Sequence, residues 1–243
     1  MQPVLAIFKR ELLGYFITPV AYVFISLFLL TSGAFSFYIS NIYERGQADL
    51  ITFFTWHPWI YLFFIPAITM RLWAEERKAS TIEILLTLPI ATWKLVTAKF
   101  LAAWAFTSIS LFLTFPLWIT VSYLGDPDHG AIISGYFGSL LMAGGYLAIG
   151  SCLSALTKNQ IIAFITGITV CFIFTISGFP MVISFFQLWL PQFLLEMISS
   201  FSFLTHFEGL TKGVINLNNI VYFVSVILLW LFINTLVLDA KKD

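Results

Sequence analysis

The sequence predicts an all-α integral membrane protein with six transmembrane helices. Of its 243 residues, 60% are hydrophobic and 10% are charged, whereas soluble domains carry about 25% charged residues. Six stretches of at least 21 residues contain no Asp, Glu, Lys or Arg. A helix needs about 20 apolar residues to cross the ~30 Å hydrocarbon core of a bilayer. Each stretch is apolar on every side, which favours helices over the alternating strands of a barrel.

The charge-free stretches place the spans in chain order. The expected spans are 18–40, 53–72, 98–123, 132–156, 160–180 and 219–238. The fifth stretch leaves room for a further short segment, so seven spans remain an alternative. Pro180 and Pro191 interrupt that segment, and a polar stretch follows it. We therefore expect 181–218 to form a re-entrant or outer helical segment plus a loop, protected by packing against the other helices.

The distribution of lysine and arginine predicts the orientation, because cytoplasmic loops are enriched in these residues. With a cytoplasmic N-terminus, two of the 12 basic residues, Arg45 and Lys212, fall outside. Both termini are therefore expected in the cytoplasm, and an odd number of spans would break this pattern. The ten residues expected inside are Lys9, Arg10, Arg71, Arg77, Lys78, Lys94, Lys99, Lys158, Lys241 and Lys242.

Residues 3–16, which precede the first span, have an amphipathic helical pattern. This pattern predicts an interfacial helix along the inner leaflet; a simple charged flank of the first span is the alternative. On a helical wheel, apolar residues gather on one side and polar or small residues on the other. The apolar side holds Leu5, Phe8, Leu12, Tyr15 and Phe16, and the opposite side holds Arg10, Glu11 and Gly14.

The stretch 71–99, between the second and third spans, carries eight of the 24 charged residues. Ser80 and Glu83 have the S-x-x-E spacing of a capping box, in which each side chain bonds the backbone near the other. Apolar residues follow up to Pro89. The pattern predicts a helix of about two turns over 80–88, which is too short to be stable alone. It is expected either to enter a groove on a partner or to rest on the membrane.

The fourth span carries small residues at four-residue spacing, Gly135, Ser139 and Ala143. Small residues at this spacing let helix backbones approach closely in membranes. The contact they serve is either packing within the chain or an interface between subunits.

Motifs for catalysis, metal binding and nucleotide binding are missing from the sequence. His57, His129 and His206 are placed at separate loops or span ends, and none has a His or Cys three or four residues away. The E-E-x-x-x-R pattern of an intramembrane protease starts at Glu75 but meets Ser80 where Arg is required. There is no phosphate-binding G-x-x-x-x-G-K-[ST] loop, and zero net charge disfavours nucleic acid. We expect no catalytic residue, metal or cofactor in this chain.

In order and content, these segments resemble the permease subunits of ABC-2 type ABC transporters. The resemblance covers nearly the full length and is closest to the GldF/NosY-like branch, which serves gliding motility and nitrous-oxide reductase. It is carried by FITPVAYVFI at 16–25, RLWAEERKASTIEILLTLPI at 71–90 and SFLTHFEGLTKGVINLNNIVYF at 202–223.

The resemblance implies a single permease domain over 1–243 in a bacterial inner membrane. Residues 3–16 would be its connecting helix, 80–88 its coupling helix and 181–218 its outer re-entrant segment. The implied partners are two ABC ATPase subunits that bind ATP-Mg, a second permease copy or paralogue, and a periplasmic or membrane accessory protein. Contact with the ATPase would involve Glu75, Glu76, Ser80, Thr81, Ile82, Glu83, Leu85 and Leu86.

The expected function is to couple ATP use in a separate subunit to export or to mechanical action on a periplasmic partner. The substrate is not implied. Two alternatives stay open: a non-transporting membrane scaffold or sensor that recruits a cytoplasmic partner, and an intramembrane enzyme.

Overall fold

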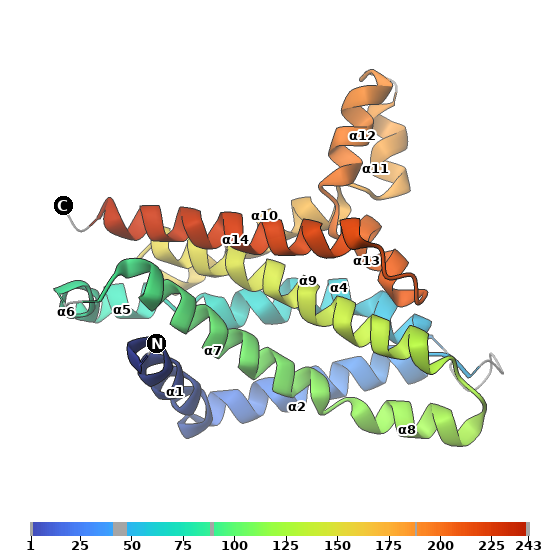
Figure 1. Ribbon diagram of the computed structural model, residues 1–243, viewed down its shortest axis with the longest axis horizontal. Coiled ribbons are helices and arrows are strands. Elements are labelled where there is room, and N and C mark those ends of the chain that lie inside the picture. Colours follow the sequence, from blue (N-terminus) through green and yellow to red (C-terminus); the bar gives the residue numbers. More distant parts are fainter. Residues whose placement is uncertain (1, 41–47, 88–89, 188, 242–243) are drawn as a thin grey trace.

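The computed structural model describes residues 2–40, 48–87, 90–187 and 189–241; the side chains of 2, 3, 84, 86 and 87 lie outside this description. The regular structure within these ranges is helical throughout, and Figure 1 shows long helices running side by side in an elongated bundle. The elements are α1 (Gln2–Ile17), α2 (Pro19–Ala34), the π-helical turn η1 (Phe35–Ile39), α4 (Ile51–Thr69), α5 (Ala74–Lys78), α6 (Thr81–Thr87), α7 (Thr92–Phe112), α8 (Phe115–Leu124), α9 (His129–Leu156), α10 (Gln160–Ile176), α11 (Pro180–Phe186), α12 (Gln192–Ser200), α13 (Phe203–Thr211) and α14 (Leu217–Asp239).

Five helical segments in the described ranges are long and apolar enough to cross a membrane. A sixth crossing requires α10 and α11 to count as one span, although they are bent by 79°. The predicted count of six is thus the upper end of what the described residues offer, and a seventh candidate is missing from them. The five segments are Pro19–Ile39, Ile51–Lys78, Thr92–Leu124, His129–Leu156 and Leu217–Asp239.

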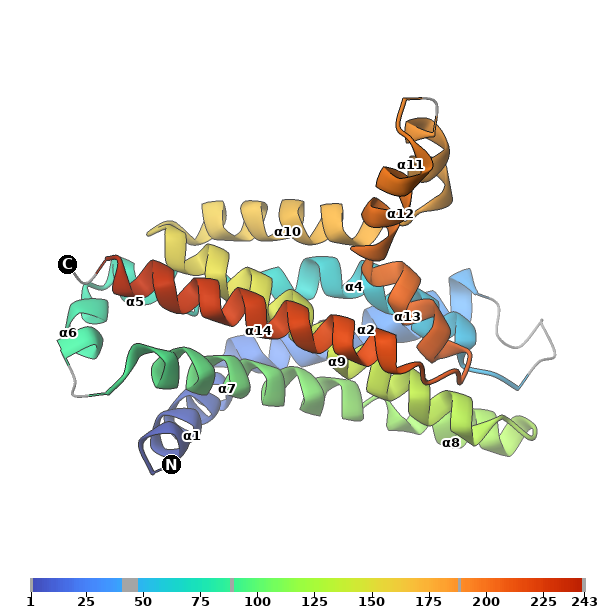
Figure 2. The same cartoon turned by 45° about the horizontal axis from the view of Figure 1, so that its top comes forward.

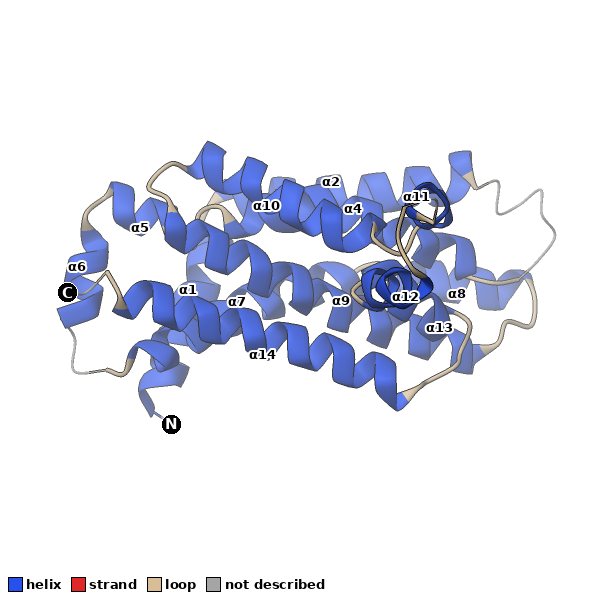
Figure 3. Ribbon diagram, turned by 90° about the horizontal axis from the view of Figure 1, so that it is seen from above, coloured by secondary structure: helices blue, strands red, loops and turns tan. Residues whose placement is uncertain are grey.

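Helix α9 lies at the centre of the bundle, with α4 on one side and α14 on another (Figure 3). A Cβ built on Gly135 would lie 2.4 Å from the ring of Phe54 in α4, and one on Gly144 would lie 2.8 Å from Ile227 in α14. The small residues of α9 therefore permit close packing within the chain, which settles the alternative that the sequence left open for them.

The segment 181–218 contains more helix than predicted. The polar stretch expected to be a loop forms α13, where the hydroxyl of Ser202 accepts a hydrogen bond from the backbone N–H of Thr205 at 3.4 Å. Phe203 and Leu210 of α13 are fully buried, and a side chain at Gly138 of α9 would collide with Leu210. The expected loop is therefore limited to residues 212–216, because apolar residues at helical spacing among the polar ones form α13.

Helices α11 and α12 form a hairpin that projects from the side of the bundle. The hairpin lies toward the end of the bundle that is opposite the chain termini (Figures 1 and 2). Its large apolar side chains are exposed, among them Met181 at 76%, Trp189 at 79% and Phe193 at 70%. The predicted re-entrant segment is thus a separate helical projection rather than a packed part of the bundle.

Candidate functional site at the charged end of the bundle

Both chain termini, α5 and α6 lie at one end of the bundle, on the left in Figure 1. The basic residues assigned to one side from the sequence belong to segments at this end, whereas Lys212 follows α13 at the other end. Arg45 and Lys242 lie outside the described residues. The fold therefore separates the basic residues along the bundle axis, as expected for a chain oriented by the positive-inside rule.

The core holds the junction between α4 and α5 through one serine of α9. The Ser154 hydroxyl accepts hydrogen bonds from the backbone N–H groups of Trp73 and Ala74, at 3.2 and 3.1 Å. It donates to the carbonyl oxygen of Met70 at 3.1 Å. One side chain thereby satisfies three backbone groups that have no helical partners between the end of α4 and the start of α5. These contacts fix where α5 starts.

The indole of Trp73 adds a second connection to the core. It is fully buried, and its Nε1–H donates to the hydroxyl of Ser151 in α9 at 3.1 Å. The side-chain amide of Asn234 in α14 donates to the same hydroxyl at 2.9 Å. The start of α5 is therefore tied to both α9 and α14, which are two of the candidate spans.

Helix α1 packs on α7 with part of the predicted apolar side, but the inward face also includes a residue assigned to the polar side. Tyr15 stacks on Phe106 of α7 with ring centroids 5.0 Å apart, and Phe16 meets the same ring edge-on. Glu11 was assigned to the polar side, yet it turns inward, and Leu5 of the predicted apolar side is 54% exposed. Glu11 can face inward because a buried cation in α7 neutralises it.

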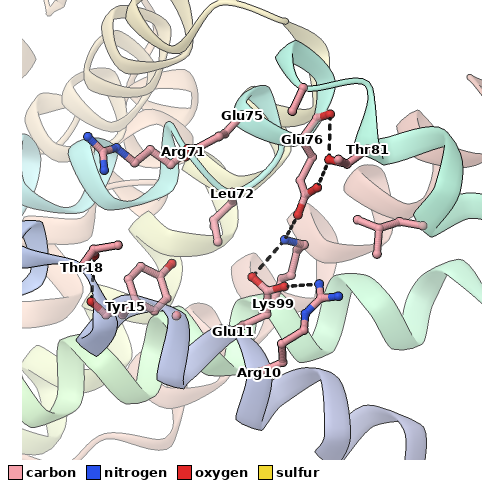
Figure 4. A pocket seen from close by; sticks show the side chains of 13 residues that line it. Arg10, Glu11, Tyr15, Thr18, Arg71, Leu72, Glu75, Glu76, Thr81 and Lys99 are labelled. Atoms are coloured by element: carbon pink, nitrogen blue, oxygen red, sulfur yellow. Dashed lines mark hydrogen bonds and ion pairs between the residues drawn. The ribbon is translucent and has the colours of Figure 1, made fainter.

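That cation is Lys99, whose side chain is 2% exposed. Its Nζ lies 3.0 Å from Glu11 Oε2 in α1 and 3.1 Å from Glu76 Oε1 in α5, as Figure 4 shows. It also lies 5.4 Å from the ring centroid of Trp73, within the range of a cation–π interaction. Buried charges require such pairing because desolvating a lone ammonium is costly.

The ion pairs extend outward at both ends. The second oxygen of Glu11 binds the guanidinium of Arg10 at 2.6 Å. The hydroxyl of Thr81, at the start of α6, is within hydrogen-bonding distance of two acceptors on Glu76. These are the carboxylate Oε2 and the backbone carbonyl oxygen. Charged and polar contacts therefore run without a break from α1 through α7 and α5 to α6.

The predicted capping box is replaced by this contact. Ser80 has a φ of +56°, in the left-handed region, whereas an N-cap residue normally has extended backbone. In the described part of the chain, no hydrogen bond joins Ser80 to Glu83. Thr81 holds the start of α6 instead, because the preceding α5 brings Glu76 within reach.

The eight predicted contact residues divide into three groups. Glu75, Ser80 and Glu83 are exposed. Glu76 and Thr81 take part in the ion-pair network, and Ile82 and Leu85 are buried at 9% and 8% exposure. The side chain of Leu86 lies outside the described residues. Ile82 and Leu85 pack within the chain, and contact of these residues with a partner stays a prediction.

A cavity of about 680 Å³ opens between α1, α5, α6 and α7. It is walled by the ion-pair network on one side and by Tyr15 and Leu85 on others, and the charged side chains of Arg71 and Glu75 also line it (Figure 4). The helices at this end are thus separated by open space, and polar contacts join them across it.

The C-terminal end of α14 closes the same end of the bundle. Lys241 donates to the carbonyl oxygens of Ala155 and Leu156 at 3.2 and 3.1 Å, so that it caps α9 with a cation. Desolvation there, together with the nearby cations of Arg77 and Lys158, lowers the pKa of Lys241 below its usual value. Asp239 accepts a hydrogen bond from Thr92 at the start of α7 at 2.5 Å.

The three histidines lie in three different helices, and no three His, Cys, Asp or Glu side chains cluster within the described ranges. His57, expected at a span end, is fully buried in α4 with Nδ1 2.8 Å from the hydroxyl of Ser139. His129 accepts from Trp118, and His206 contacts Asn219.

Sequence reasoning missed Glu11 and Lys99 as members of the site. Lys99 carries a signal, because it is followed directly by an apolar span in which a lone ammonium is unfavourable. Its partner Glu11 lies 88 residues away, and nothing in the local pattern of either residue identifies the other.

Together, the spans and the charged end define a multi-span helical membrane protein whose short, non-spanning helices are held to its spans. Residues 22–239 match the family described as ABC-2 family transporter protein. Because this match covers most of the chain, the chain belongs to the ABC-2 transporter family. Members are the membrane components of transporters rather than catalytic subunits, and they normally work with an ABC ATPase subunit. A search of curated proteins found no significant match.

Proposed function

We propose that the chain is the permease subunit of a bacterial inner-membrane ABC-2 transporter, with both termini in the cytoplasm. Two ATPase subunits would bind ATP-Mg, and a second copy or paralogue of the permease would complete the complex. ATP use would drive export or a mechanical action on a periplasmic partner. Within the family, we place the chain in the GldF/NosY-like branch on the three sequence stretches quoted above.

One observation carries this proposal: α6 is short, lies at the charged end and is attached to two other helices. Thr81 connects it to Glu76, and Lys99 connects Glu76 to α7. Helix α7 begins the candidate span Thr92–Leu124. A force applied to α6 from the cytoplasm would thus reach a span directly, as a coupling helix requires.

The exposed carboxylate of Glu83 on α6 indicates how a partner would bind. Ile82 and Leu85 are buried, and α5 adds the exposed Glu75 and Lys78. A partner that binds here would meet carboxylates and so would need basic or hydrogen-bond-donating groups. Charge complementarity of this kind selects partners and speeds association.

The exposure of α1 supports its assignment as an interfacial helix. Leu5, Leu13 and Ile17 are 54%, 61% and 79% exposed, although the opposite face of α1 packs on α7. These three apolar side chains would be covered if α1 lay along the headgroup boundary of the inner leaflet.

The exposed aromatic hairpin of α11 and α12 supports mechanical action on a periplasmic partner as a second candidate output. Trp189 and Phe193 are 79% and 70% exposed, and the hairpin projects from the side of the bundle toward the end away from α6 (Figure 1). An apolar projection at this position could engage an outer protein, with the same drive from the ATPase.

Co-purification with a co-expressed ABC ATPase subunit tests the proposal. Glu83→Lys reverses an exposed charge on α6, and Asp126→Lys makes the same reversal at an exposed site at the other end. We expect Glu83→Lys to recover several-fold less ATPase, because it replaces an attraction with a repulsion, and Asp126→Lys to recover the normal amount.

Equal recovery with both variants would overturn the coupling assignment for α6. Normal ATPase recovery with ATP turnover that no permease variant alters would favour the scaffold alternative. Catalysis by the purified chain without any ATPase would favour an intramembrane enzyme.

A further inference from the structure

Lys99 contacts carboxylates from two separate helices. Glu11 belongs to α1 and Glu76 to α5, and the two ammonium–carboxylate distances are nearly equal, 3.0 and 3.1 Å. Lys99 itself sits two turns into α7, which is otherwise anchored in the bundle. The three helices therefore meet at a single buried charge.

We propose that Lys99 is the positioning residue that locks α1 and the α5–α6 pair to α7, so that these helices move as one body. This inference rests on the proposed role of α6 as the coupling helix and names the residue that would transmit its movement.

The packing around Lys99 explains why the lock would act mainly on α5 and α6. Helix α1 keeps aromatic contacts with α7 through Tyr15 and Phe16 when its ion pair is removed. Beyond its start, which Ser154 holds, α5 faces the cavity of about 680 Å³. Glu76 gives α5 and α6 a charged contact with α7 across this space, in addition to the apolar packing of Ile82 and Leu85 within the chain.

The burial of Lys99 depends on its two carboxylate partners. With both in place its side chain is 2% exposed, although it lies on the wall of the cavity. A buried ammonium left with an incomplete partner set is strongly unfavourable. Movement of α5 and α6 away from α7 would therefore strand a charge, and the favoured movement keeps both carboxylates in place.

Distance measurement between spin labels on α1 and α5 tests the proposal. Lys9 and Lys78 are exposed and outside the network; each is replaced by Cys after the buried Cys152 and Cys171 are changed to Ala. The full chain is reconstituted in nanodiscs, alone and with its ATPase, both nucleotide-free and trapped with ATP and vanadate. We expect one narrow distance distribution that is the same in all states.

The Lys99→Met variant should broaden this distribution, and Lys99→Arg should restore it, since a guanidinium can still pair with both carboxylates. Lys94→Met is the matched control: it removes a lysine from the same helix, where no ion pair is found within the described residues, and should leave the distribution narrow. Glu76→Gln is a milder variant that keeps the Lys99–Glu11 pair and should loosen α5 and α6 nearly as much.

A narrow distribution in folded Lys99→Met or in Glu76→Gln would overturn the proposal, as would a distance that changes on vanadate trapping in the parent protein. If Lys99→Met does not fold, Glu76→Gln decides. This test is separable from the test of the proposed function, because the labels report on the chain alone. A negative result with Glu83→Lys would refute the ATPase contact of α6, whereas a negative result with the labels would refute the role of Lys99.

Discussion

Replacing Ser154 with Ala should destabilise the protein far more than the loss of one exposed hydroxyl. The hydroxyl makes three hydrogen bonds, at 3.1 to 3.2 Å, to the backbone of Met70, Trp73 and Ala74. Trp73 and Ala74 are fully buried, so their N–H groups would lose their partner without gaining water. At about 1 kcal/mol for each bond, and more for each stranded donor, the loss is about 2–4 kcal/mol.

Thermal unfolding in detergent, followed with a thiol-reactive dye, measures this loss. Cys152 and Cys171 are free and buried, so the dye reacts only as the protein opens. For a chain of this size, the expected loss lowers Tm by roughly 4–16 °C. Ser225→Ala is the control, because that exposed hydroxyl bonds only within its own helix, and its Tm should change little. Equal melting of the two variants would refute the inference that Ser154 holds the start of α5.

Two further predictions use the same protein. Gly150→Ala should lower the free energy of unfolding by about 1–3 kcal/mol through overpacking, because a Cβ there would lie 2.2 Å from Thr69 Oγ1 and rotation of Thr69 would bring Cγ2 into the same space. Gly33→Ala is the control: a Cβ there has nothing within 4 Å, and the variant should melt at or slightly above the parent Tm. The reverse order of Tm values would contradict the close packing of α9. Single cysteines at 83 and 212, in a background without Cys152 and Cys171, should react with a membrane-impermeant thiol reagent from opposite sides of the membrane. In intact cells, the reagent should label the cysteine at 212 and leave the one at 83 unlabelled. Labelling of position 83 in intact cells would place the charged end outside.

Family membership and the site geometry support each other at α6. The match over 22–239 shows the family but does not say how force would pass through this chain. In the proposed coupling role of α6, the contacts of Thr81, Glu76 and Lys99 would provide that route. The route includes charge pairs at a cavity in addition to the apolar packing of Ile82 and Leu85, so a single substitution can remove its charged part and leave the core in place.

The spans were predictable because each is decided by its own composition. A charge in hydrocarbon is costly wherever the rest of the chain lies, so a charge-free stretch of sufficient length reports a candidate span by itself. The fifth span is the exception. Its helix α10 ends at Ile176 and the chain then bends by 79°, because α11 leaves the bundle instead of continuing along it.

The inward faces of short helices were less predictable. With two turns or fewer, α6 offers too few positions for a wheel to separate buried from exposed sides, and Ile82 and Leu85 turned out to face the chain's own body. In α1, Glu11 violated the apolar pattern of the inner face. Its burial is intelligible only together with Lys99, which supplies the opposite charge.

The sequence by itself therefore determined the membrane class, the candidate spans and the gathering of basic residues at one end, since these follow from the cost of placing each residue in hydrocarbon. Only the tertiary structure decided that Glu11 and Glu76 share one site with the buried Lys99, that Ser154 fixes the start of α5 and that α13 packs against α9. Such contacts join residues far apart in the chain, and pairwise attraction in a low-dielectric interior depends on distances that no local pattern encodes.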